Sequence, residues 1–203
     1  MSRECETKKR LRETAIDLIW QQSYGALSVE DICQRAGAKK GSFYYFFSSK
    51  SELTVAADEA YWQQNRPHWD AVFSPQVPPL ERLSGYCRSI YERQAAKFAE
   101  TGKVCGCPNT GLGSELSTQD ENLRQKALQI IDRTCKYLET TLRDAANEGL
   151  IERGDFSATA REIYAFVAGM ILQAKIRNNL EILRNLKSAL FRWIGAKESA
   201  PVN

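Results

Sequence analysis

Histidine is almost absent from this chain: His68 is the only one, and no two cysteines have the Cys-x-x-Cys spacing. Because zinc sites are built mainly from such Cys and His ligands, the sequence predicts no metal site. It also has no phosphate-binding glycine loop and no recognisable pair of catalytic carboxylates. The run Gly111-Leu112-Gly113 lacks the preceding strand and the third glycine of a nucleotide-binding fingerprint. We therefore expect no catalytic residues and no cofactor.

Long apolar runs are missing as well. No uninterrupted stretch approaches the roughly 18 to 20 residues that span a bilayer, and no apolar segment of the secretory type follows the charged N-terminal residues. We expect a cytoplasmic protein that does not contact membranes. Thiols stay reduced in that compartment, so scattered cysteines favour free thiols over a disulfide framework. The cysteines are Cys5, Cys33, Cys87, Cys105, Cys107 and Cys135.

Acidic residues are absent from Ala36 to Lys50. The first 50 residues hold nine Lys or Arg and six Asp or Glu. The remaining residues hold 28 − 9 = 19 basic and 25 − 6 = 19 acidic side chains, so the net charge of +3 lies entirely in the first quarter of the chain. This asymmetry indicates a polyanion-binding head on a neutral body.

Apolar residues recur at the three- and four-residue spacing of amphipathic helices along most of the chain. Ser28 with Asp31 and Ser49 with Glu52 have the spacing of helix capping boxes. Tyr24-Gly25 is expected to close the first helix, with the glycine in its usual C-terminal role. The Gly- and Cys-rich segment 104–116 is expected to be irregular or a broken helix. The expected helices span 7–22, 29–36, 39–46, 51–73, 80–99, 122–147, 157–178 and 180–194.

Two short helices joined at Gly37 have the pattern of a helix-turn-helix. In the second, Phe43, Phe46 and Phe47 are spaced to pack inward. Five consecutive aromatic residues cannot all face one side of a helix, so at least one of the two tyrosines between these phenylalanines should point outward. Gly41 within this helix costs about 1 kcal/mol relative to Ala. That cost is explained if a DNA phosphate or base edge must approach the backbone closely.

The sequence from Ala36 to Leu53, AGAKKGSFYYFFSSKSEL, resembles the DNA-binding signature of the TetR family of bacterial one-component repressors, and the resemblance covers about residues 8–55. It implies an all-α protein with a three-helix helix-turn-helix head, a larger ligand-binding body and a homodimer that binds a palindromic operator. We accordingly divide the chain into a DNA-binding domain (1–50), a helical ligand-binding and dimerisation domain (51–195) and a flexible tail (196–203).

The resemblance also implies which residues contact DNA. The second helix of the motif would enter the major groove, while Ser28 and Lys50 would bind phosphate. Lys50→Ala is then expected to weaken binding to every sequence and to flatten its salt dependence. Lys39 and Tyr45 depart from the small hydroxyl residue and the histidine that the family often has there. The predicted DNA-binding residues are Ser28, Lys39, Lys40, Gly41, Ser42, Tyr44, Tyr45 and Lys50.

In the body, the last two helices have apolar surface beyond a single stripe, so we expect them to pair with a second copy as a four-helix bundle. An aromatic-rich body suits an apolar or aromatic small-molecule effector. Cys105 and Cys107, in a flexible segment that precedes a new helix, are candidate sensors of electrophiles or oxidants. The predicted ligand-binding residues are Trp62, Trp69, Tyr86, Ile90, Cys107, Leu112, Phe166 and Met170.

The leading hypothesis is a ligand-responsive transcriptional regulator that represses its target. Two alternatives from other classes remain open. One is a thiol enzyme that uses Cys107 and His68, which a turnover assay with electrophilic substrates would reveal. The other is a helical dimerisation or ligand-carrying protein that does not bind DNA, which would fail to retain operator DNA on a gel at low salt.

Overall fold

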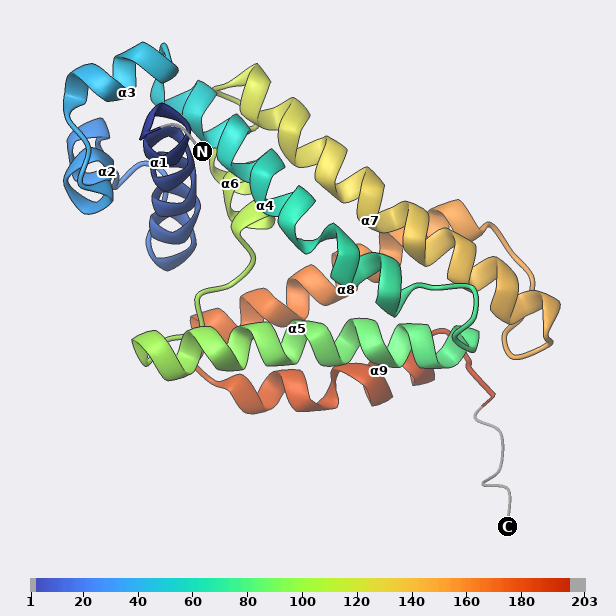
Figure 1. Ribbon diagram of the computed structural model, residues 1–203. Coiled ribbons are helices and arrows are strands. Elements are labelled where there is room, and N and C mark those ends of the chain that lie inside the picture. Colours follow the sequence, from blue (N-terminus) through green and yellow to red (C-terminus); the bar gives the residue numbers. More distant parts are fainter. Residues whose placement is uncertain (1–2, 198–203) are drawn as a thin grey trace. The chain divides into compact units, whose positions relative to one another are not determined.

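The computed structural model describes the backbone of residues 3–197 and the side chains of residues 6–197, and this part of the chain is all helical (Figure 1). The predicted all-α class is confirmed. Within the described residues, no helix is both long and apolar enough to cross a membrane. The elements are α1 (Arg3–Gln21), α2 (Val29–Ala36), α3 (Lys40–Phe46), α4 (Lys50–Val72), α5 (Pro79–Thr101), α6 (Pro108–Leu116), α7 (Glu121–Asn147), α8 (Phe156–Ile176), the 3-10 helix η1 (Leu180–Asn185) and α9 (Leu186–Trp193).

Two elements differ from the sequence prediction. The segment expected to be irregular contains the regular helix α6, which Pro108 begins. Proline suits the first helical position because its φ is already fixed and its missing N–H would have had no partner there. The helix expected over 180–194 is divided into η1 and α9, because Asn185, the last residue of η1 and the N-cap of α9, has a φ of −89° and a ψ of 6°. Of the predicted tail, residues beyond 197 lie outside the described part of the chain.

The described chain forms two compact units. The head unit joins the N-terminal residues through Pro67 to Cys107–Ile130, and the body unit joins His68–Gly106 to the residues from Ile131 onward. This division differs from the predicted boundary at residue 50. The segment Cys107–Ile130 packs with the N-terminal residues, and no local sequence pattern indicates that contact. The functional division of the chain at residue 50 remains a prediction.

The head unit has one hydrophobic core that draws on both of its segments. Leu11, Phe43 and Leu53 are fully buried in it, and Leu112 and Leu116 of α6 belong to the same cluster. Burial of apolar side chains stabilises such a unit by about 25 cal/mol per Å² removed from water. The three N-terminal helices therefore share their core with a helix more than 50 residues further along the chain.

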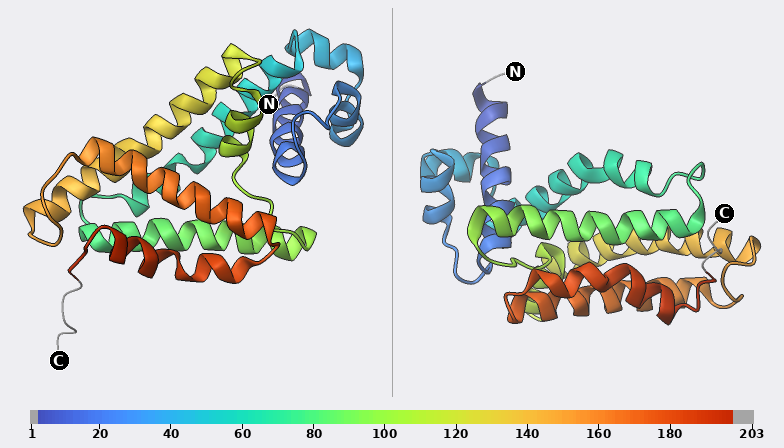
Figure 2. Two further views of the ribbon diagram at one scale, coloured as in Figure 1. Left: turned by 180° about the vertical axis from the view of Figure 1, so that it is seen from behind. Right: turned by 90° about the horizontal axis from the view of Figure 1, so that it is seen from below.

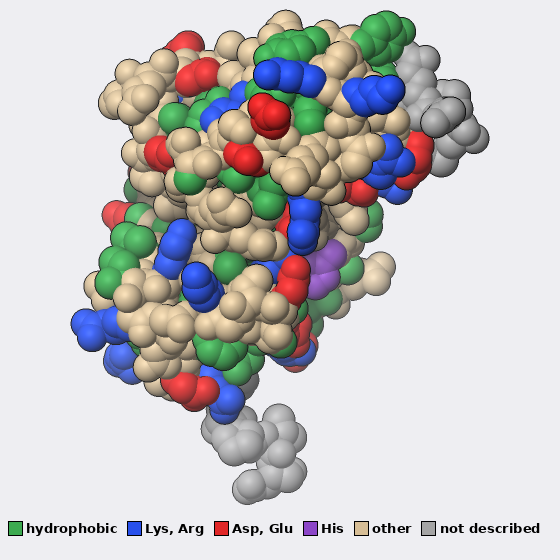
Figure 3. All heavy atoms as spheres, turned by 90° about the vertical axis from the view of Figure 1, so that its left-hand side faces the viewer, with side chains coloured by type: hydrophobic (Ala, Val, Ile, Leu, Met, Phe, Trp, Pro, Cys, Tyr) green, Lys and Arg blue, Asp and Glu red, His purple; other side chains and the backbone are tan. Residues whose placement is uncertain are grey.

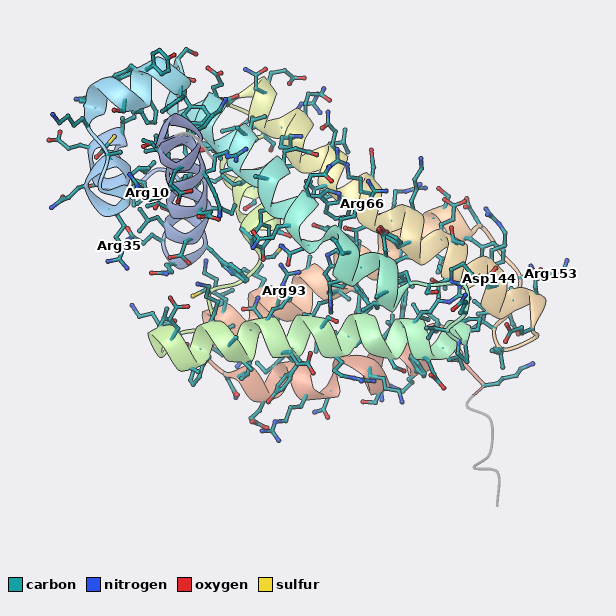
Figure 4. The ribbon with its side chains drawn as sticks, viewed as in Figure 1. Arg10, Arg35, Arg66, Arg93, Asp144 and Arg153 are labelled. Carbon is teal, nitrogen blue, oxygen red and sulfur yellow. The ribbon has the colours of Figure 1, made fainter. Side chains whose placement is uncertain are left out.

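In the body unit, η1 and α9 pack against both α5 and α8 (Figure 2). The guanidinium of the buried Arg82, on α5, lies 2.5 Å from the carboxylate of Asp144 on α7, and Figure 4 labels this aspartate. Arg82 also donates to the backbone oxygens of Pro75 and Val77, so it holds the turn that precedes α5. His68 bonds through Nε2 to the hydroxyl of Ser89, 2.9 Å away.

Candidate nucleic-acid interface

The start of α2 is fixed by Ser28 and Asp31. The Ser28 hydroxyl accepts a hydrogen bond from the Asp31 backbone N–H (3.1 Å), and the Asp31 carboxylate accepts one from the Ser28 backbone N–H (2.8 Å). This capping box confirms the prediction. The hydroxyl and backbone N–H of Ser28 both bond to the carboxylate and lower the pKa of Asp31. A phosphate contact from Ser28 stays a prediction, and its hydroxyl would have to leave this carboxylate to donate to DNA.

The turn between α2 and α3 depends on Gly37, as predicted. Its φ of 60° and ψ of 37° lie in the left-handed region, where glycine avoids the strain that a Cβ would create. The Gly37 N–H donates to the Gln34 carbonyl (3.2 Å) and the Ala38 N–H donates to the Cys33 carbonyl (2.9 Å). These bonds satisfy the carbonyls at the end of α2 and direct the chain into α3.

The aromatic residues of α3 divide between the core and the surface. Phe43 and Phe47 are buried and Phe46 is half-buried, whereas Tyr44 is 53% and Tyr45 is 72% exposed. The predicted orientation is confirmed, since both tyrosines face outward. Figure 3, which views the left-hand side of Figure 1, shows Lys and Arg side chains beside hydrophobic ones, a class that includes Tyr, on the upper part of that face.

The other predicted contact residues of α3 lie on or near this surface. Lys39, Lys40 and Gly41 are exposed and Ser42 is half-buried. Lys39 occupies the N-cap position of α3 without making a side-chain cap, as expected where the family often has a hydroxyl residue. A Cβ added at Gly41 would meet nothing within 4 Å, so the protein leaves this position open. The helix therefore presents an exposed basic and aromatic surface supported by buried phenylalanines.

Lys50 has a local role that the sequence did not reveal. Its ammonium donates to the backbone carbonyls of Tyr24 (2.9 Å) and Leu27 (2.6 Å) and lies 3.8 Å from the centre of the Tyr24 ring. Burial at this position lowers the pKa of Lys50. Lys50 thus ties the first turn of α4 to the segment between α1 and α2. Its contact with phosphate stays a prediction.

Of the two hydrogen bonds predicted for the capping box of α4, the structure has one. The Ser49 hydroxyl accepts from the Glu52 backbone N–H (3.1 Å), as a capping box requires. The Glu52 carboxylate, however, accepts from the backbone N–H (2.8 Å) and hydroxyl (2.6 Å) of Ser48, one residue before the cap. The predicted return bond to Ser49 is therefore wrong, because a second serine just before the cap offers two donors to the same carboxylate.

The segment between α1 and α2 corrects another prediction. Gly25 does not adopt the left-handed conformation expected of a glycine that ends a helix. Instead, the carboxylate of Glu115 on α6 accepts hydrogen bonds from the backbone N–H groups of Gly25 (2.7 Å) and Tyr24 (3.3 Å). Sequence reasoning missed Glu115 because these partners are 90 and 91 residues away and no local pattern joins them.

The predicted ligand-binding residues are divided between the two units, so their joint role stays a prediction. In the body unit, Trp69 and Tyr86 have ring centres 6.0 Å apart, and Phe73 lies against both. Phe166 stacks on Trp193 of α9 with ring centres 6.0 Å apart. Trp62, Cys107 and Leu112 lie in the head unit, and Trp69, Tyr86, Ile90, Phe166 and Met170 lie in the body unit.

The five cysteines whose side chains are described are free thiols, and Cys107 is the one that is not buried. Burial raises the pKa of the Cys87 thiol to about 12, so this thiol stays protonated and unreactive. Cys105 is buried, with its sulfur 3.6 Å from the Lys103 carbonyl. Cys5 lies outside the described side chains. Among the described residues, no group of three or more His, Cys, Asp or Glu could hold a metal ion.

Comparison with known proteins gives two family matches. Residues 11–57 match the model of bacterial regulatory proteins of the tetR family, and residues 79–190 match the model of the tetracyclin repressor-like C-terminal domain. The second match alone spans more than half of the 203 residues. The first covers α2, α3 and the exposed surface described above, and the second covers most of the body unit.

Relatives match over nearly the whole chain. The HTH-type transcriptional regulator in the lacX 3′ region of Lactococcus lactis subsp. lactis is 29% identical over 197 residues, covering 94% of this chain and 96% of that protein. The HTH-type transcriptional repressor NemR of Escherichia coli K12 is 26% identical over 191 residues, covering 90% of each. The crystal structure of the reduced form of E. coli NemR has a TM-score of 0.80 at 24% identity, covering 95% of this chain and 99% of that one. The chain therefore belongs to the TetR family of bacterial regulatory proteins, which are helix-turn-helix transcriptional regulators and not enzymes.

Proposed function

We propose that this regulator is a homodimeric repressor that binds a palindromic operator through α3 and leaves it when a small-molecule effector binds. The observation that carries the proposal is the exposure of Tyr44 and Tyr45, next to Lys39 and Lys40, on a helix anchored by the buried Phe43. Such a surface suits the major groove, where side chains read base edges while phosphate contacts set the register. NemR of E. coli and the related DhaR of Mycobacterium sp. (strain GP1) are both named as repressors. We propose that this protein acts in the cytoplasm.

An exposed apolar surface on α8 and α9 supports the homodimer. Leu172 and Ile176 on α8 are 54% and 72% exposed, and Trp193 on α9 is 46% exposed. Leu172 and Ile176 are four residues apart and so share one face of α8, and exposed apolar faces of this kind mark interaction sites. A second copy seated there by a two-fold axis would form a four-helix bundle. The two heads would then have to meet one face of the duplex, roughly 34–36 Å apart or a multiple of that distance.

The aromatic cluster of the body unit supports an apolar or aromatic effector. Phe73 and Tyr86 are buried there, and Tyr137 stacks on Phe73 with ring centres 5.0 Å apart. Ligand pockets are lined mostly by apolar and aromatic side chains with a few polar groups. An effector can release the operator only if it binds more tightly to a conformation that has lower affinity for DNA.

Footprinting of the DNA upstream of the protein's own gene tests the proposal. We expect protection of one palindrome by the wild-type protein and loss of protection on addition of one class of compound. Lack of any sequence-selective protection at low salt would reject the operator-binding role and favour the ligand-carrying alternative. Protection that persists with every compound, while transcription rises when the protein is supplied, would show an activator.

Substitution of Gly41 should change stability and DNA binding in opposite directions. Gly41→Ala should stabilise the exposed helix by up to about 1 kcal/mol, because the new methyl group meets no protein atom. The same methyl group would stand where DNA approaches, so we expect operator affinity to fall about tenfold, equivalent to 1.4 kcal/mol. Thermal melting and electrophoretic mobility shift measure the two effects.

Gly111→Ala is the matched control for this prediction. Gly111 also lies within a helix, and a Cβ there also meets nothing within 4 Å. It should gain stability without losing operator affinity. If Gly41→Ala binds the operator as well as wild type does, no close approach occurs at α3.

Thiol sensing is a narrower proposal and rests on Cys107. Cys107 is the N-cap residue of α6, and its side chain is partly accessible while the other described thiols are buried. The crystal structure of the relative NemR is that of its reduced form. The partial accessibility of this thiol, where the other described thiols are buried, supports a sensing role for it.

Brief treatment of the native protein with N-ethylmaleimide should label Cys107 before Cys33, Cys87, Cys105 and Cys135, as measured by peptide mass spectrometry. If Cys87 or Cys135 reacts first, the described burial does not govern reactivity. The sensing role itself requires that peroxide or a quinone release wild-type protein from its operator. Release of the Cys105→Ser/Cys107→Ser protein by the same treatment would contradict it.

A further inference from the structure

Two charged side chains bind the backbone of the segment between α1 and α2, one through its N–H groups and the other through its carbonyl groups. Glu115 accepts the N–H groups of Tyr24 and Gly25, at 3.3 and 2.7 Å. From the other side, Lys50 donates to the carbonyls of Tyr24 and Leu27. Hydrogen bonds to a charged group are stronger than those between neutral groups. The turn therefore has few alternative positions while both side chains hold it.

The helix that carries Glu115 is fixed in the same core as the DNA-binding helices. Leu112 and Leu116 flank Glu115 on α6, and both are buried in the cluster that contains Leu27 and Phe43. Figure 1 shows α6 beside α1, and the two helices are in contact. Glu115 thus reaches the turn from a firmly packed backbone, and its side chain is held there by the two hydrogen bonds to the turn.

Gly25 makes room for this carboxylate. A Cβ added at Gly25 would lie 2.8 Å from the Glu115 Oε1 atom, closer than such atoms approach in proteins. The backbone of Gly25 is not left-handed, so it needs no glycine for its own conformation. Close approach of Glu115 is therefore the reason that the structure offers for glycine at this position.

We propose that Glu115 is a positioning residue for operator binding. Its carboxylate fixes the Tyr24–Gly25 turn. The turn sets the position of Ser28, the N-cap of α2, and therefore how α3 is presented to DNA. The DNA-binding module accordingly includes α6 as well as the three N-terminal helices. This inference rests on the DNA-binding role of α3, and Glu115 itself does not touch DNA.

For substitution of Glu115, the loss of a negative charge and the loss of the positioning bonds predict opposite changes in operator affinity. Removing an acid from a protein that binds a polyanion should strengthen binding to any DNA. Loss of the positioning bonds should instead weaken binding to the operator. For Glu115→Ala we expect operator affinity about 10- to 100-fold below wild type, by analogy with the loss of hydrogen bonds to a charged group. Affinity for a scrambled duplex of equal length should stay equal or rise.

Glu121→Ala is the matched control. It removes the same charge from the same unit, but the Glu121 carboxylate bonds to Arg124 and Gln125 on its own helix. It should leave the operator affinity at or slightly above the wild-type value. Glu115→Gln keeps one oxygen that can accept the Gly25 N–H, so it should recover part of the lost affinity.

A double-mutant cycle with Gly25→Ala makes the test independent of general destabilisation. The new methyl group displaces the carboxylate without straining the backbone, so Gly25→Ala should lower operator affinity about tenfold alone. It should have little further effect in the Glu115→Ala background, because the contact is already gone. Additive effects of the two substitutions would overturn the proposal.

Hydrogen exchange separates a misplaced turn from an unfolded head. In Glu115→Ala, exchange should accelerate in peptides covering 23–28 while peptides covering α7 keep wild-type protection. Equal losses of operator and scrambled-duplex affinity, or unchanged operator affinity, would overturn the proposal. If the wild-type protein itself shows no preference for the operator duplex, the proposed DNA-binding function fails instead, and the two failures are thereby distinguished.

Discussion

Phe43→Ala should strongly destabilise the DNA-binding head and thereby weaken operator binding. Phe43 is 0% exposed and lies in the cluster that joins α1, α2, α3 and α4. Truncation of a buried phenylalanine costs about 3–5 kcal/mol, because apolar contacts are lost and a cavity remains. Whole domains are stable by only about 5–15 kcal/mol, so this is a large part of the total. Chemical denaturation followed by circular dichroism measures the loss.

The neighbouring Tyr44 provides the control for that result. Its ring is more than half exposed on the same helix. Tyr44→Ala should leave stability within about 0.5 kcal/mol of wild type, as surface substitutions usually do, yet weaken operator binding. If Phe43→Ala instead retains wild-type stability, the core assigned to the head is wrong.

Leu172→Glu should convert the proposed dimer into monomers and thereby prevent stable operator binding. The leucine side chain is 54% exposed in the single chain, so a monomer tolerates the change. In a dimer that buries this surface, each copy would place an unpaired carboxylate in an apolar interface, at a cost of several kcal/mol. The symmetry of the interface doubles this cost. Sedimentation velocity and mobility shift on the operator measure the two consequences.

Leu128→Glu is the same substitution on another surface. Leu128, on α7 in the head unit, is 42% exposed. It should leave both the dimer and operator binding intact. Should Leu172→Glu and Ile176→Glu both sediment as dimers, the apolar face of α8 is not the dimer interface, and another surface must join the two copies.

Interactions between residues close in sequence were predictable from the sequence. The Ser28–Asp31 cap, the left-handed Gly37 and the inward phenylalanines of α3 are all determined within a few residues. Periodicity and capping chemistry act over this range, so the order and spacing of the residues indicate them. The break between η1 and α9 escaped prediction because the leucine spacing fits an unbroken helix and the departure lies in the backbone of Asn185.

Interactions between distant residues were not predictable. Lys50 was expected to bind phosphate, yet its nearest partners are carbonyls 23 and 26 residues earlier in the chain. Glu115 carried no signal, since an acid in a Gly-rich helix is indistinguishable from a solvated one until the fold brings it to Gly25. In both cases a side chain binds backbone groups of a distant segment. Nearly every residue has the same backbone donor and acceptor, so such a contact leaves no pattern in the sequence.

The bond between Glu115 and Gly25 joins atoms on residues 90 positions apart, and this separation delays the head during synthesis. Bacterial chains elongate at about 5–20 residues per second, so roughly 5–18 seconds separate translation of the two residues. During that interval the three N-terminal helices lack the carboxylate that fixes their first turn and the two leucines that complete their core. We therefore expect the nascent head to mature only after α6 has left the ribosome, and a chain truncated before α6 to bind the proposed operator more weakly.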